Sequence, residues 1–347
     1  MSDAPSFLES LDAEARAQLL SVARPVHFDC GAILARHGDP ARGAFVLREG
    51  AVEAVVTLPG GESLTVAQLG SGDVFGEMAL LELGACTATI RASAPVEGWF
   101  IAHEDFRAIV SQRQPAAIRL QHAITAILAG KLAAVNARLL ASPADEDRPA
   151  RPDFPRDPLE GVARLAQAPF DAGPVLPRLP AFERFSAEEI GELVAQARYL
   201  DLPRGHGVFR AGDEAVAAFV VLRGAVEIVA ALTNRERRVA VLGPGQLVGY
   251  MSVLRNARHS TSGYAREAAV LLEFPAAAFR ERYFGSSRTS SLLRSAVQSS
   301  LLGAMARTNR TLTRLISQAK LEASHRREKQ LETAYHAQLA TTTVIPA

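Results

Sequence analysis

The chain has 347 residues, enough for two domains of ordinary size, and its hydrophobic content of 48% can supply two cores. It carries 38 Lys and Arg against 37 Asp and Glu, so it lacks the basic excess of most nucleic-acid-binding proteins. Its two cysteines, Cys30 and Cys86, fit neither a disulfide framework nor a zinc motif. We therefore expect a protein of the reducing cytoplasm that binds neither nucleic acid nor metal.

The N-terminal segment predicts a helix rather than a targeting signal. Acidic residues stand where a signal peptide needs positive charge, and no uninterrupted apolar run of membrane-spanning length occurs later in the chain. Asp12 is suited to cap the helix that follows it. We expect no membrane insertion.

Short strands come next, and a long helical stretch follows them. Phe45–Leu47 and Ala51–Val56 flank a turn at Gly50, which is typical of a small antiparallel barrel. A short helix is expected to open at Gly76. From Glu104 to Leu140 apolar residues recur at helical spacing.

The middle of the chain has the composition of a linker. Nine of the nineteen prolines lie between Ala141 and Pro180, and proline disfavours both helix and sheet. Within this segment Val162–Ala166 suits either a short helix or a patch that docks on a domain. A second set of elements then begins, with Ser186 and Glu189 spaced as a capping box.

An internal repeat relates the two halves. Residues 38–53 match 212–227 at an offset of 174, with ten identities in sixteen positions. With one residue deleted, the match continues from 70–81 onto 243–254. The strands Phe219–Leu222 and Ala225–Val229 and the helical stretch Ser287–Leu339 therefore repeat the elements of the first half.

The repeated unit resembles a known sensor domain. The segment FGEMALL at 75–81, followed by TATIRA at 87–92, a β-roll before it and a long helix after it, is similar to the cyclic-nucleotide-binding domain. Catabolite activator protein, the regulatory subunits of protein kinase A and nucleotide-gated channels share that domain. The resemblance covers roughly 5–140 and 178–320 and implies two tandem β-rolls of the double-stranded β-helix type, each flanked by helices.

The domain boundaries follow from the repeat, the linker and the last helix. We predict a first cyclic-nucleotide-binding-like domain with its long helix, a Pro-rich linker, a second such domain and a long dimerisation or interaction helix, at 1–141, 142–177, 178–286 and 287–340.

In the first copy the resemblance implies a sugar-phosphate site. Backbone N–H groups at the short helix would hold a phosphate, and Glu77 would accept a hydrogen bond from a ribose hydroxyl. The candidate ligand-binding residues of this copy are Gly76, Glu77, Met78, Ala79, Cys86 and Thr87. The candidate ligands are cAMP, cGMP or a cyclic dinucleotide, and no cofactor is required.

The first copy departs from the family at the phosphate. Where the family has an arginine before the Ser/Thr, this chain has Cys86 before Thr87. A hydrogen bond to a charged group contributes about 1.5–3 kcal/mol, so its loss weakens binding roughly tenfold to a hundredfold. Three alternatives stay open: weakened binding, a less anionic ligand, or an arginine that reaches in from elsewhere.

The second copy departs at the ribose. Tyr250 stands in place of Glu77, and His259 stands in place of Cys86, with Arg258 one position before it. Tyr250 either stacks on a ligand or fills the pocket. The weaker candidate ligand-binding residues of this copy are Gly249, Tyr250, Met251, Arg258, His259 and Ser260.

The last helix needs a partner for its apolar stripe, which consists of Leu293, Val297, Leu301, Met305, Leu312, Leu315 and Ile316. By resemblance it forms a parallel dimer and closes over the nucleotide base; the alternative is packing on its own β-roll. No helix-turn-helix and no catalytic constellation is visible. We predict a non-enzymatic, cytoplasmic, homodimeric sensor that signals to a protein partner, with a ligand-free scaffold as the alternative.

Overall fold

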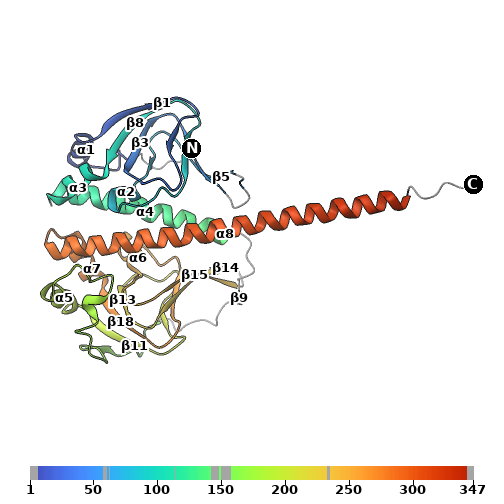
Figure 1. Ribbon diagram of the computed structural model, residues 1–347. Helices are drawn as coiled ribbons and strands as arrows, with labels where there is room; N and C mark the ends of the chain where they lie inside the picture. The colour runs from blue at the N-terminus through green and yellow to red at the C-terminus, as the bar shows by residue number, and fades with distance from the viewer. Residues whose placement is uncertain are drawn as a thin grey trace, which may run out of the picture.

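The first half of the chain forms a β-roll that is followed by a long helix (Figure 1). In the computed structural model the described residues are 7–57, 61, 63–112, 114–141, 148–149, 158–232 and 235–341. The first β-roll consists of two four-stranded antiparallel sheets, in the orders β1-β8-β3-β6 and β2-β7-β4-β5. Its strands are β1 (Arg24–Phe28), β2 (Ile33–Ala35), β3 (Gly43–Glu49), β4 (Val52–Thr57), β5 (Ser63–Leu69), β6 (Val74–Phe75), β7 (Thr89–Ala92) and β8 (Val96–Ala102). Its helices are α1 (Ala13–Leu20), α2 (Met78–Leu81), α3 (His103–Ser111) and α4 (Pro115–Ala141).

The second half repeats this architecture, and each of its two sheets gains one edge strand. The sheet orders are β10-β11-β18-β13-β16 and β12-β17-β14-β15-β9. The strands are β9 (Arg148–Pro149), β10 (Arg164–Leu165), β11 (Arg198–Leu202), β12 (Gly207–Phe209), β13 (Ala217–Arg223), β14 (Val226–Leu232), β15 (Arg235–Leu242), β16 (Leu247–Val248), β17 (Ser262–Ala265) and β18 (Ala269–Pro275). The helices are η1 (Leu176–Arg178), α5 (Ala187–Val194), α6 (Tyr250–Arg255), α7 (Ala276–Phe284) and α8 (Arg288–Thr341). The tandem β-roll fold expected from the sequence is thereby confirmed.

Local signals at the helix starts are also confirmed. The Asp12 carboxylate accepts a hydrogen bond from the Ala15 N–H at 2.9 Å and so caps α1. Ser186 and Glu189 form a complete capping box at α5, with distances of 3.2 Å and 2.9 Å. These short-range contacts fix where both copies begin.

The segment predicted as a linker, 142–177, contributes to the second β-roll where it is described. β9 pairs with β15, and β10 pairs with β11. Leu159 is buried inside the second β-roll, and Leu176 packs on the helices beside it. From residue 158 onward this segment therefore docks on the second domain. Of the two alternatives for Val162–Ala166, a short helix or a docking patch, the structure shows the docking patch.

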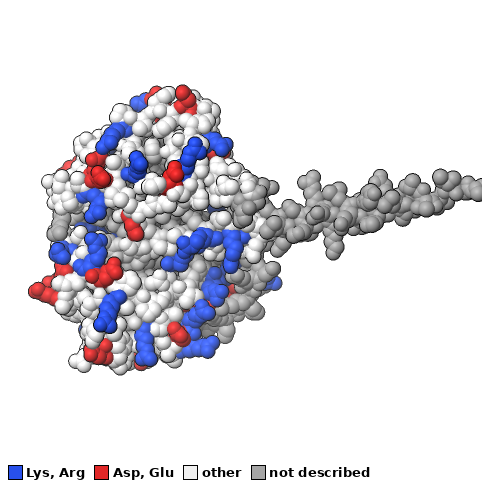
Figure 2. Space-filling model, in the orientation of Figure 1, with Lys and Arg blue, Asp and Glu red and all other residues white. Residues whose placement is uncertain are grey.

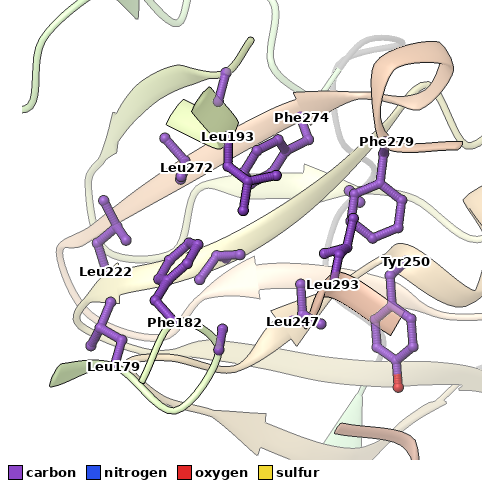
Figure 3. Packing of buried hydrophobic residues seen from close by; sticks show 14 of the residues in the cluster. Leu179, Phe182, Leu193, Leu222, Leu247, Tyr250, Leu272, Phe274, Phe279 and Leu293 are labelled. Atoms are coloured by element: carbon purple, nitrogen blue, oxygen red, sulfur yellow. The ribbon is translucent and has the colours of Figure 1, made fainter. Parts of the chain in front are cut away.

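The core of the second copy lies between its β-roll and its helices. Figure 3 shows Phe182, Leu193, Phe279 and Leu293 converging from separate elements on one apolar cluster. Burial of large aliphatic and aromatic side chains of this kind stabilises the fold by roughly 1.5–3 kcal/mol for each side chain. The cluster holds α8 firmly against its own β-roll.

The long helices of the two copies pack against each other in parallel. In Figure 1 they run side by side between the two β-rolls. Arg294 contacts Gln121, Gln298 contacts Thr125, and Thr308 contacts Asn136, with separations of 173, 173 and 172 residues. Because these separations nearly equal the repeat offset, α4 and α8 pair in register through equivalent positions.

The apolar content of α4 is explained by this packing. Among the described residues α4 is the one helix whose length and composition would suit a membrane span. A core helix meets the same criterion, and Leu120, Ile124 and Leu128 of α4 are fully buried in the cluster shared with α8.

Candidate functional site

The turn before α2 has the left-handed backbone expected for a glycine. Gly76 has φ +74°, and a Cβ at this position would lie 2.6 Å from the Gly43 carbonyl oxygen, so only glycine fits. The next residues turn tightly, because Ala79 N–H donates to the Gly76 carbonyl at 2.9 Å. Met78 and Ala79 pack toward the core, with Ala79 fully buried. Gly76 and Glu77 are therefore the two predicted residues best placed to meet a ligand.

Glu77 is buried, with 4% of its surface exposed, and it has a partner on α4. Its carboxylate lies 2.8 Å from Lys131 Nζ. The same ammonium group donates to the Val74 carbonyl at 2.8 Å. Glu77 is thus both the predicted ribose acceptor and an ionic link between the first β-roll and its long helix.

The segment that carries Cys86 is held by backbone hydrogen bonds to the loop before β3. Cys86 N–H donates to the Asp39 carbonyl at 2.8 Å, and Gly38 N–H donates to the Cys86 carbonyl at 2.9 Å. Burial, and secondly the charge of Asp39, raise the pKa of the Cys86 thiol. Cys86 therefore stays neutral near pH 7 and supplies no counter-charge, while Thr87 beside it is exposed.

These residues line a cavity of about 1740 Å³. Gly76, Glu77, Cys86 and Thr87 form part of its wall. Other parts come from the strands and loops of the first β-roll, from the end of α4, from residues 180–185 and from α8. Ligand pockets typically measure about 300–1,000 Å³, so the space exceeds the needs of one mononucleotide. The cavity thus brings together six predicted residues of the first copy and two long helices from different halves of the chain.

In the second copy a histidine occupies the equivalent space. His259 is 5% exposed, and its ring stacks on Phe209 with centroids 4.2 Å apart. Its Cε1 lies 3.4 Å from where a Cβ of Gly249 would stand, against the turn that matches Gly76. Burial lowers the pKa of His259 to about 4, so the ring is neutral near pH 7. The second site is filled by its own side chain.

The other predicted residues of the second copy do not gather around a ligand site. Tyr250 is 6% exposed and belongs to the core cluster drawn in Figure 3, so it fills the core rather than stacking on a ligand. Arg258 donates to the Gly212 carbonyl at 2.7 Å and lies 3.7 Å from Glu214. Ser260 is exposed, and Met251 packs against the cores of both halves. Tyr250, Arg258 and Ser260 thus lie in different surroundings: the first in the core, the other two at the surface.

Two substitutions between the copies explain why one pocket is open. Ala35 and Cys86 in the first copy stand where the second has Phe209 and His259, at offsets of 174 and 173. Ala35 lines the cavity, whereas the Phe209 ring lies 2.7 Å from where a Cβ of Gly263 would stand. The first copy therefore has two small side chains where the second packs two stacked rings, and the cavity extends to these side chains.

Several residues of the site belong to no sequence motif and could not be identified from one. Lys131 is 54 positions from Glu77, and Ala35 precedes the first repeat segment by three residues. The wall formed by Met305 and Asn309 of α8 comes from the other half of the chain. The repeat offset could have identified Ala35, because it aligns this small residue with the large Phe209 of the second copy.

The buried histidine predicts a pH dependence of stability. His259 has a pKa of about 4 when folded and 6.5 when unfolded, so the unfolded chain binds more protons between those values. Its contribution is fully present above pH 6.5 and falls as the pH drops toward 4. One pKa unit corresponds to about 1.36 kcal/mol, so the burial of His259 should lower the free energy of unfolding by about 2 kcal/mol between pH 7 and pH 4.5.

Urea unfolding at both pH values tests this expectation on the parent chain and on His259→Phe. The variant should lose about 2 kcal/mol less than the parent on acidification. His122, whose pKa burial and Arg294 lower to about 4, stays in both proteins and contributes equally to each. An unchanged slope in the variant would show that His259 is not buried in neutral form.

The fold defines a class, that of β-roll domains that are followed by a long helix. Residues 25–113 and 199–284 match the family described as the cyclic nucleotide-binding domain. These segments make up about half of the chain, and the chain therefore belongs to this family. The family is one of regulatory domains.

Curated relatives match parts of the chain. "Cyclic AMP receptor protein" of Thermus thermophilus is 34% identical over 110 residues, which cover 31% of this chain and 49% of the relative. "Glutaminase 1" of Bradyrhizobium diazoefficiens is 36% identical over 133 residues, which cover 38% of this chain and 21% of the relative. This chain thus spans less than half the length of either relative.

Among solved structures, the regulatory domain of Toxoplasma gondii PKA with cAMP aligns with 87% of this chain and 92% of its own, at 18% identity and a TM-score of 0.31. The N-terminal domain of a transcriptional regulator from Streptomyces coelicolor A3(2) is 30% identical over 35% of this chain and 87% of its own, with a TM-score of 0.33. The two segments that match the family carry the assignment.

Proposed function

We propose that this chain is a non-enzymatic cytoplasmic regulator that binds one cyclic nucleotide in its first β-roll. The observation that carries the proposal is the open cavity at Gly76 and Glu77, set against the pocket that His259 fills in the second copy. The N–H groups of the turn suit a phosphate, and the Glu77 carboxylate suits a ribose hydroxyl. The second β-roll serves as a structural partner.

The output of binding passes through the long helices. A ribose hydroxyl at Glu77 shares the carboxylate with Lys131 and so changes the ionic contact that holds α4. Because α4 packs in register with α8, a shift of one helix alters the surface of the other. Ligand changes the populations of two helix arrangements only if it binds one of them more tightly. A protein partner would recognise the favoured arrangement.

Calorimetric titration with cAMP, cGMP and a cyclic dinucleotide tests the proposal. We expect saturable binding of one nucleotide per chain, because one of the two pockets is open. Binding by Cys86→Arg alone would show that the parent pocket is degenerate and would favour a scaffold. Two nucleotides per chain would contradict the filled second site.

Homodimerisation is part of the proposal, and the helix pair restricts where it occurs. Leu301 and Met305 of α8 already pack in a cluster with the first half, whereas Leu312, Leu315 and Ile316 are only half-buried. A second copy would therefore join along α8 beyond Met305. Such an interface would need an apolar seam on that stretch.

Light scattering after size-exclusion chromatography tests the dimer. We expect the parent to be a dimer and Leu315→Glu to be a monomer, because a charge in an apolar seam is costly to bury. Leu315 does not line the cavity, so nucleotide binding should persist and serve as the control for folding. A monomeric parent would rule out the homodimer.

A further inference from the structure

The wall of the cavity carries a surplus of positive charge although Cys86 supplies none. Seven Lys or Arg residues line it against four Asp or Glu residues. Figure 2 shows Lys and Arg side chains gathered where α8 leaves the two β-rolls. Facing basic side chains raise the local concentration of an anionic ligand.

Arg42 has its backbone fixed beside the turn at Gly76. Its carbonyl accepts a hydrogen bond from His103 N–H at 2.9 Å, and the ring of His103 contacts the Ala79 carbonyl of α2 at 2.5 Å. The next residue, Gly43, has its carbonyl 2.6 Å from where a Cβ of Gly76 would stand. The start of β3 therefore lies directly against the turn that opens α2.

The neighbouring loop places Arg42 beside Cys86 as well. Ala41 N–H donates to the Gly84 carbonyl at 2.8 Å, and Pro40 forms a β-bridge with Ala85. Arg42 thus lies between the two segments, 76–79 and 85–87, that form the expected phosphate end. It lines the cavity and is exposed.

The guanidinium of Arg42 makes no hydrogen bond or ion pair with any residue that the structure describes. Arg24, in contrast, pairs with Asp105 at 2.8 Å. Arg36 also lines the cavity, but it lies further than Arg42 from the turn at Gly76 in the sequence. In the second copy, whose pocket is filled, Val216 stands at the equivalent position. At this position an arginine is therefore found only in the copy that has the cavity.

We propose that Arg42 supplies the counter-charge for the phosphate of the bound nucleotide, in place of the arginine that Cys86 has replaced. The inference rests on the proposed function and deepens it, because it makes the ligand an anionic phosphodiester rather than a neutral nucleoside. A guanidinium binds phosphate oxygens through two parallel N–H donors. The site thereby keeps a positive charge at the phosphate, supplied by an arginine from a different segment, the loop before β3.

Titration of Arg42→Gln with cAMP and with adenosine tests this assignment. We expect the variant to bind cAMP roughly tenfold to a hundredfold more weakly, the effect of losing one charge-assisted hydrogen bond. Adenosine, which has no phosphate, should bind both proteins within about twofold of each other. Adding Cys86→Arg to Arg42→Gln should restore cAMP binding. The gain in affinity should be larger than the gain that Cys86→Arg causes in the parent, because either arginine can neutralise the same phosphate charge.

The controls separate this inference from the proposed function. Arg107→Gln, on the exposed face of α3 and outside the cavity, should bind cAMP as the parent does. An equal loss in Arg36→Gln would assign the effect to the general charge of the cavity and would overturn the role of Arg42. Undiminished cAMP binding by Arg42→Gln would overturn it too and leave the proposed function intact. A parent that binds none of the nucleotides would refute the proposed function itself.

Discussion

Ala35→Phe is expected to abolish nucleotide binding and leave the fold intact. The second copy carries Phe209 at the equivalent position, and there the ring packs against His259 inside the β-roll. A phenyl ring at residue 35 would enter the cavity of about 1740 Å³ at the end that Gly76 and Cys86 line. Because ligand and ring cannot share that space, affinity should fall more than about a hundredfold, which corresponds to about 2.7 kcal/mol.

Titration calorimetry measures this loss, and thermal unfolding checks the fold. The cavity can accept the added ring without the overpacking that usually costs about 1–3 kcal/mol. Ala108→Phe, on the exposed face of α3, adds the same side chain outside the cavity and should leave binding unchanged. Near-parental affinity of Ala35→Phe would mean that the ligand does not occupy this end of the cavity.

Arg294→Ala is expected to give the largest loss of stability. Arg294 is 1% exposed and joins three elements. Its guanidinium donates to Gln121 of α4 at 3.1 Å, to the Tyr283 carbonyl at 2.8 Å and to the Gly285 carbonyl at 2.6 Å. Alanine would leave these buried acceptors without their donor, at a cost of about 1–3 kcal/mol each, so the free energy of unfolding should fall by about 3–5 kcal/mol.

Urea denaturation measures this change, with Arg310→Ala as the matched substitution on an exposed position of the same helix. The control should shift the free energy of unfolding by less than about 0.5 kcal/mol. A loss below about 1 kcal/mol for Arg294→Ala would show that the buried contacts between α4 and α8 are not maintained in solution. In Arg294→Ala, nucleotide binding at the first β-roll should also no longer change the arrangement of α4 relative to α8.

The predictions confirmed from sequence are those that depend on residues close together in the chain. The caps at Asp12 and Ser186, the strands around Gly50, the helix after Gly76 and the duplication all follow from local spacing. The family of the chain also follows, because the motif residues of the site are contiguous. The structure places Gly76, Glu77, Cys86 and Thr87 in the wall of one cavity, and their role in binding a ligand stays a prediction.

Other features required contacts between distant segments. Docking of residues 158–177 on the second β-roll depends on pairing with β11, which a Pro-rich composition does not indicate. The choice of Lys131 as the partner of Glu77 depends on where α4 crosses the β-roll. Packing of Tyr250 in the core depends on the direction in which α6 faces.

By itself the sequence determined that the chain has two β-rolls of the cyclic nucleotide-binding family and that each copy lacks part of the usual ligand set. Only the tertiary structure decided which copy has an open pocket and that α4 and α8 pair within one chain. The physical reason is that capping and strand alternation act over a few residues. Whether a pocket is open, in contrast, depends on the volumes of side chains such as Ala35 and Cys86, brought together from separate strands and loops.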